Sequence, residues 1–116
     1  MNDLEKRLFA FAIRTIEYLR KLPDLAEFKV IKYQLTKSST SSGANYEEAQ
    51  AGSSKADFNN KTRISLREMR ESNYWLRIIN GIIKDKNIDD ELSFLIKESN
   101  ELKNILGSIV QKTRTK

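Results

Sequence analysis

The stretch from Ser53 to Lys86, SSKADFNNKTRISLREMRESNYWLRIINGIIKDK, decides the fold of this chain. It contains no proline, and its single glycine, Gly81, lies near its end. As a continuous α-helix it would be about 45–50 Å long, at ~1.5 Å per residue. A helix of this length sets the height of whatever packs around it.

Apolar residues recur along this stretch at helical spacing on two neighbouring faces. The second face lies roughly 100° around the helix from the first. It has two interpretations: the extra width expected of a helix packed among three others, or a subunit interface anchored by a tryptophan. Spacing alone leaves both open. The first face comprises Phe58, Thr62, Ser65, Met69, Leu76, Ile79 and Ile83, and the second comprises Ile64, Trp75, Ile78 and Ile82.

A third face of the same stretch is basic and includes one aromatic ring. One interpretation is a solvated face that keeps a long helix soluble. The other is contact with nucleic acid, because arginine suits phosphate and base-plane contacts, and an exposed tyrosine can stack on an unpaired base. If the N-terminal helix shares this outer face, its basic residues would extend it. The third face comprises Asn60, Arg63, Arg67, Arg70, Tyr74, Arg77, Gly81 and Lys84, and the possible extension comprises Arg7, Arg14 and Lys21.

Charge is concentrated on this stretch. The chain of 116 residues has a formal net charge of +5, and residues 53–86 contain eight basic and four acidic residues. Most of the excess positive charge therefore lies where the basic face is predicted, which points to an anionic partner.

Composition excludes several classes of protein. A chain with 39% hydrophobic and 32% charged residues is too apolar to be disordered. It has no cysteine and no histidine, which removes disulfides, thiolate metal sites and the commonest general base. We therefore expect no enzyme, with no catalytic residue, metal, cofactor or small-molecule substrate. No run approaches the ~20 apolar residues that span a bilayer, and the N-terminus does not resemble a signal peptide. We expect a cytoplasmic protein with no membrane partner.

The rest of the chain is also predicted to be helical, because one proline and four glycines favour long helices over strands joined by turns. Asn2 and Glu5 form a capping-box pattern at the start of the first helix, and Pro23 ends it. The apolar stripe of this helix is widened into a broad buried face by Phe9, Ala12, Ile13 and Ile16.

The predicted helices span about residues 3–22, 25–51, 54–85 and 89–112. Their short connections force antiparallel neighbours. The predicted fold class is therefore all-α, an antiparallel up-down-up-down four-helix bundle that forms one domain over residues 1–116.

One segment of the second helix is ambiguous. Residues 36–44 read TKSSTSSGA, and by propensity they form a linker, because small hydroxyl residues compete with the helical backbone and glycine weakens it. In the alternative, helical interpretation, small residues let two helices approach closely while their hydroxyls bond carbonyls one turn earlier.

Three motifs carry a family resemblance over nearly the whole chain. They are Leu19-Arg20-Lys21-Leu22-Pro23 at the first turn, Gly43-Ala44-Asn45 followed by Glu48-Ala49, and Tyr74-Trp75-Leu76. Together they resemble the four-helix-bundle proteins encoded in intervening sequences of bacterial 23S ribosomal RNA genes. The position before Gly43 is commonly apolar in that family, and here it is Ser42.

The resemblance implies that residues 36–44 continue the second helix. It also implies a homopentamer, a barrel of five bundles. A related branch is the accessory protein of diversity-generating retroelements, which associates with a reverse transcriptase and binds nucleic acid through a basic surface. The family offers no catalytic residues.

Two hypotheses follow. In the first, the protein is a non-enzymatic, oligomeric accessory protein that uses the basic face to bind structured RNA, a ribonucleoprotein partner or a nucleic-acid enzyme. In the second, it is a protein-interaction scaffold without affinity for nucleic acid, and Trp75 marks its interface.

Overall fold

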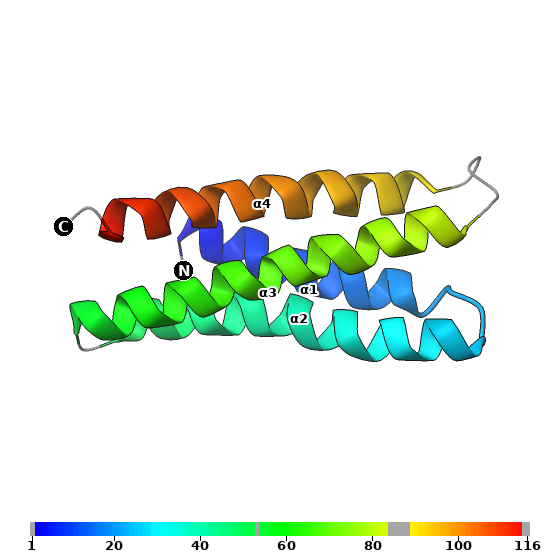
Figure 1. The fold of residues 1–116 in the computed structure, drawn as a ribbon, viewed down its shortest axis with the longest axis horizontal. Helices are drawn as coiled ribbons and strands as arrows, with labels where there is room; N and C mark the ends of the chain where they lie inside the picture. Colours follow the sequence, from blue (N-terminus) through cyan, green and yellow to red (C-terminus); the bar gives the residue numbers. More distant parts are fainter. Residues whose placement is uncertain (1, 53, 84–88, 115–116) are drawn as a thin grey trace.

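The structure, a computed structural model, describes residues 2–52, 54–83 and 89–114. Four helices run antiparallel and side by side, in a body of 47 × 22 × 20 Å (Figure 1). They are α1 (Asp3–Leu19), α2 (Ala26–Ala51), α3 (Lys55–Ile82) and α4 (Asp90–Arg114). The predicted up-down-up-down four-helix bundle is confirmed.

The helices are arranged as a square in cross-section. Each of α1 and α3 packs closely against both α2 and α4, while no Cα atom of α1 lies within 8 Å of one of α3 in the described part of the chain. These two helices therefore lie diagonally opposite. Extension of the basic face by Arg7, Arg14 and Lys21 required that the first and third helices share an outer face. They do not share one.

The helix ends follow local hydrogen bonds. The Asn2 side chain accepts from the Glu5 amide at 2.8 Å, and the Glu5 carboxylate accepts from the Asn2 amide at 3.0 Å, so the predicted capping box is present. The predicted end of the first helix at residue 22 is wrong by three residues. The Lys21 and Leu22 amides bond carbonyls only three residues back, at 3.0 and 3.2 Å, and this tighter turn leads into Pro23.

The other boundaries agree within two residues where they can be compared. Asp89 caps α4 by accepting from the Leu92 amide at 3.2 Å, so the helix proper begins at Asp90. The predicted end of the third helix at residue 85 lies outside the described residues.

Propensity favours a linker over residues 36–44, but α2 runs through them without a break, as the predicted helix over 25–51 and the family resemblance imply. Ser38 and Ser42 are buried against α3. Their hydroxyl oxygens lie 2.8 Å and 3.2 Å from those of Ser72 and Ser65. The Ser42 and Ser65 hydroxyls also each donate to the other residue's carbonyl, at 2.8 and 2.7 Å. Contacts between helices have overridden propensity, because small side chains let α2 and α3 approach closely and hydrogen-bond across the seam.

The core lies along the axis of the bundle and includes the first predicted face of α3, through Met69, Leu76 and Ile79. The broad buried face predicted for the first helix is wrong in part. Phe9 is 57% exposed and Ile13 is 44% exposed, because α1 uses a narrower stripe, with Leu8 and Phe11 in the core, and its flank is left open beside α2.

Candidate nucleic-acid interface

The basic face of α3 is exposed along its length. Arg63, Arg67, Arg70, Tyr74 and Arg77 are all exposed, and the Tyr74 side chain has 48% of its surface in solvent. Lys84, the remaining charged member of the predicted face, lies outside the described residues. One helix thus presents four guanidinium groups and a phenol ring toward one side of the molecule.

Part of this face borders a polar pocket between α3 and α4. The pocket has a volume of about 460 Å³. It is lined by Arg70, Asn73 and Arg77 from α3, and by Lys103, Asn104 and Gly107 from α4. Among the residues that the structure describes, no carboxylate lines it. We refer to these six residues as the α3–α4 pocket.

The Asn73 side chain holds Arg77 in place. Asn73 is buried, and its amide nitrogen donates to the Ser99 hydroxyl at 2.9 Å and to the Ile96 carbonyl at 3.3 Å. Its side-chain oxygen accepts from Arg77 Nε at 2.9 Å. The Arg77 guanidinium carbon also lies 5.7 Å from the centre of the Tyr74 ring. A buried amide thus orients the arginine, while the terminal nitrogens of its guanidinium stay available to a ligand.

The cations of this face are largely free of acidic partners. Arg63, Arg70 and Lys103 form no ion pair with a carboxylate in residues 2–52, 54–83 and 89–114. Arg67 lies 3.5 Å from Glu68, and its side chain is 71% exposed. A pair of this length, with its arginine mostly in solvent, contributes little. The positive charge of α3 is therefore available to an external anion.

Arg7 and Arg14 differ in this respect, because carboxylates of α4 hold both. Arg7 donates to Glu98 through Nε and Nη2, at 3.1 and 2.7 Å, and to Glu101 at 3.0 Å. Arg14 donates to Glu91 at 3.0 and 2.6 Å. Hydrogen bonding to these carboxylates raises the pKa of both guanidinium groups. These two arginines join α1 to α4, whereas Lys21 is exposed.

Sequence reasoning missed the contribution of α4. Lys103 and Asn104 sit on a helix whose overall charge is balanced, and nothing in its spacing sets them apart. Only the antiparallel register of α3 and α4 brings them beside Arg70 and Arg77. The signal available in the sequence was Gly107 one turn after Lys103, which leaves space on that side of the helix.

The predicted subunit interface is partly buried. Trp75 and Ile78 pack against the core, and Trp75 Nε1 donates to the Glu71 carboxylate at 3.1 Å. Ile64 is half-buried, and Ile82 is 36% exposed. The stripe thus combines core packing with remaining apolar surface, and its role between subunits stays a prediction.

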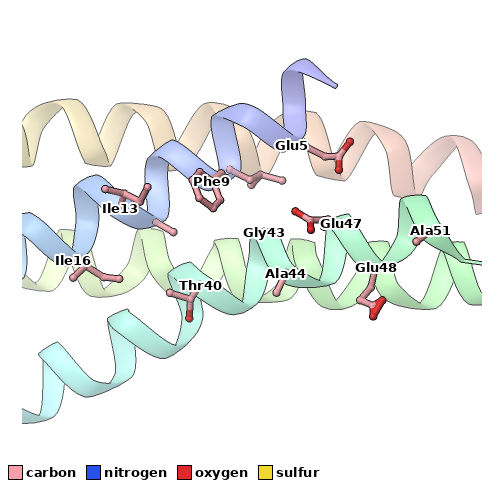
Figure 2. A pocket seen from close by; sticks show the side chains of 12 residues that line it. Glu5, Phe9, Ile13, Ile16, Thr40, Gly43, Ala44, Glu47, Glu48 and Ala51 are labelled. Atoms are coloured by element: carbon pink, nitrogen blue, oxygen red, sulfur yellow. The ribbon is translucent and has the colours of Figure 1, made fainter. Parts of the chain in front are cut away.

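A larger apolar groove lies between α1 and α2 (Figure 2). Its volume is about 580 Å³. Gly43 forms part of its floor, where a Cβ atom would lie 3.4 Å from Leu8 Cβ, so the helices approach closely here. The side chains around this floor are Glu5, Phe9, Ala12, Ile13, Ile16, Thr40, Ala44, Glu47, Glu48 and Ala51. We refer to this feature as the α1–α2 groove.

The groove differs in character along its length. Glu5 and Glu47 lie near one another at one end, and Ile13 and Ile16 lie toward the other (Figure 2). Neither Glu47 nor Glu48 pairs with a cation in the part of the chain that the structure describes. The groove therefore offers an apolar surface with an acidic end.

The residues that the structure describes lack two further features. No group of three or more Asp or Glu side chains is placed to hold a metal ion. No helix is both long and apolar enough to cross a bilayer.

Comparisons with known proteins agree on one family. Residues 2–108 match the family model described as 23S rRNA-intervening sequence protein. A crystal structure of a Bacteroides thetaiotaomicron protein of unknown function, from the S23 ribosomal protein family, is similar over 92% of this chain and 97% of that one. Its sequence identity is 30% and its TM-score is 0.79. No curated protein matches the chain.

Proposed function

Since the chain belongs to the 23S rRNA-intervening sequence protein family, we propose that it is a non-enzymatic accessory protein that binds RNA through the basic face of α3. The observation that carries this proposal is a set of exposed guanidinium groups on one helix, most of them without a carboxylate partner among the described residues. Such groups attract phosphates and bind them through charge-assisted hydrogen bonds.

The α3–α4 pocket supports the proposal, because it adds Lys103 from a second helix to the same side of the molecule. Cations from two helices allow contacts to successive phosphates of one strand. Contacts of this kind give affinity without sequence specificity, which fits a protein that positions RNA rather than reading it.

The test is a triple charge reversal, Arg63→Glu, Arg67→Glu and Arg70→Glu, with binding of a labelled RNA hairpin followed by fluorescence anisotropy over a range of salt concentrations. Wild-type affinity should fall steeply with salt. The triple variant should lose at least tenfold in affinity, and the slope of log K against log salt should decrease by about 3, roughly one per lost phosphate contact.

The matched control reverses three exposed lysines elsewhere, with Lys6→Glu, Lys29→Glu and Lys37→Glu. It changes the net charge by the same amount and should bind nearly as the wild type does. If the wild type does not bind RNA at low salt, or if both triple variants lose affinity equally, α3 is not the binding face.

A second candidate function, protein–protein assembly, is favoured by the α1–α2 groove. We propose that a second copy of the chain places the α3 stripe of Ile64, Trp75, Ile78 and Ile82 on the apolar floor of this groove. The groove and the stripe are different surfaces, so the contact is head-to-tail and can close into a ring. A ring of five is what the family resemblance implies.

Sedimentation velocity at micromolar concentration tests the assembly. Phe9→Asp and Ile82→Asp, one in the groove and one on the stripe, should each yield monomers, because each places a carboxylate in the buried contact. Ser108→Asp, an exposed change on α4, should leave the oligomer intact. A monomeric wild type would contradict the proposal, as would an oligomer that survives both substitutions.

A further inference from the structure

We infer that the α3–α4 pocket binds the phosphate of a single unpaired nucleotide, whose base stacks on Tyr74. The inference rests on the proposed RNA binding and specifies it. It identifies the class of RNA, single-stranded or looped rather than duplex, and it assigns a role to residues of α4.

The pocket has the chemistry of a phosphate site. Arg70, Arg77 and Lys103 approach one space from two helices, and Asn104 adds an amide that can donate hydrogen bonds. No carboxylate from the described part of the chain lines that space. Arginine forks and a lysine ammonium together suit the several oxygens of a phosphate.

The pocket is also organised before a ligand arrives. Arg77 is bonded to Asn73, which is buried and in turn bonded to Ser99 and Ile96 of α4. The guanidinium is thus oriented by the two helices that line the pocket. An oriented donor loses less conformational freedom on binding than a free side chain does.

Tyr74 makes the ligand a nucleotide rather than a simple anion. Its ring lies 5.7 Å from the Arg77 guanidinium carbon, so an exposed aromatic surface adjoins the phosphate site. The Tyr74 ring also packs against Trp75 in a T-shaped pair, with 5.4 Å between ring centres, which limits its movement. A base attached to a phosphate at Arg77 is therefore well placed to reach the ring.

Duplex RNA does not fit this combination. Its bases are stacked on one another inside the helix, and proteins reach mainly its phosphates and 2′-hydroxyls. An aromatic platform beside a phosphate site instead suits single strands, loops and bulges, whose bases can turn outward.

Gly107 provides a test that removes no charge. It lines the pocket, and a Cβ atom there would meet nothing within 4 Å, so a larger side chain fits the helix and extends into the open space. Replacing a helical glycine also favours the helix. Gly107→Leu should therefore fold and obstruct the pocket. The matched control is Ser108→Leu, at the next residue of α4, which is exposed and does not line the pocket.

The experiment measures the affinity of each variant for a labelled single-stranded 12-nucleotide RNA and for a 12-base-pair RNA duplex, at fixed salt. Gly107→Leu and Tyr74→Ala should each weaken single-strand binding about tenfold, within the range that base–aromatic stacking gives, and should leave duplex binding nearly unchanged. Ser108→Leu should behave as the wild type. Tyr74→Phe should also retain binding, because the stacking surface remains.

Competition identifies the source of the phosphate. Inorganic phosphate and uridine monophosphate are added separately to the single-strand complex; the nucleotide should displace the RNA at lower concentration than phosphate, because only the nucleotide carries a base. Equal competition would overturn the role of Tyr74 and leave a simple anion site.

The two proposals fail differently. Absence of all RNA binding would overturn the proposed function and this inference together. If RNA binds but Gly107→Leu and Tyr74→Ala affect neither ligand, or weaken single strand and duplex equally, the inference fails while the basic face of α3 remains the binding surface.

Discussion

Buried hydroxyl groups in this protein differ in whether they have a hydrogen-bond partner. Ser42 and Ser65 are fully buried and exchange hydrogen bonds across the α2–α3 seam. Thr15 of α1 is also fully buried, yet its hydroxyl has no hydrogen-bond partner among the described residues. An unpaired buried hydroxyl loses its hydration without compensation, so it destabilises the fold.

Thr15→Val should therefore stabilise the protein. The substitution replaces the hydroxyl with a methyl group of similar size, and we expect the free energy of unfolding to rise by about 1 kcal/mol. Urea denaturation followed by circular dichroism measures it. Ser65→Ala, which removes a satisfied buried hydroxyl, should change stability in the opposite direction. A loss of stability in Thr15→Val would mean that the hydroxyl is bonded in solution.

Spacing along one helix was enough to predict which arginines of α3 share an exposed face. It could not reveal Lys103, because the position of that residue beside Arg70 depends on how two helices are offset along their axes. Nor could it show that Arg7 and Arg14 are paired, because their carboxylates lie on α4, far away in the chain.

The seam between α2 and α3 is where neighbouring helices determine local structure. Residues 36–44 have low helical propensity, and the helix persists because Ser38 and Ser42 fit closely against α3 and bond it. Small size and a hydroxyl group are both needed at such positions. A larger side chain would push the two helices apart.

Ser42→Leu should destabilise the protein by about 1–3 kcal/mol, the usual cost of overpacking, and also break the bonds to Ser65. The measurement is thermal and urea unfolding. Ser108→Leu makes the same change at an exposed position of α4, and its stability should stay within about 0.5 kcal/mol of the wild type. Equal stability of both variants would show that α2 and α3 are not closely packed at Ser42.

Helix positions were largely predictable, because capping residues, Pro23 and apolar periodicity act locally. How far each helix is covered by its neighbours was harder to predict. The buried face predicted for the first helix included Phe9 and Ile13, since periodicity reports which residues are apolar and not how far the next helix covers them. The packing of Ser42 could not be derived from propensity for the same reason.

Ion pairs join α1 to α4 along one side of the bundle. The Arg14 and Arg7 side chains bridge α1 to α4, and Arg14 also lies 3.7 Å from the centre of the Phe94 ring. The hydrogen bond from Arg14 lowers the pKa of Glu91. Because the folded pKa lies below the unfolded value, this pair stabilises the bundle above the unfolded pKa, and the stabilisation is lost as pH falls through the folded pKa.

Arg14→Gln should thus lower the free energy of unfolding by about 0.5–1 kcal/mol at neutral pH, since the pair is partly exposed to solvent. The difference from the wild type should shrink below about pH 4, where an unperturbed Glu becomes protonated. Urea denaturation between pH 3 and pH 7 measures both. Arg67→Gln should show little dependence of this kind, because the Arg67 side chain is mostly in solvent and lies 3.5 Å from Glu68. A difference that stays constant with pH would contradict the assigned pairing.

The first helix is short: α1 has 17 residues, against 26 in α2 and 28 in α3. The N-terminus therefore stops short of the end where α2 meets α3, and this hairpin tip extends beyond it (Figure 1). Fewer neighbours mean that less apolar surface must be exposed to open the tip than to open the middle. Amide hydrogens near Lys55 should consequently exchange with solvent through local opening, while those near Met69 should exchange only when the whole bundle unfolds.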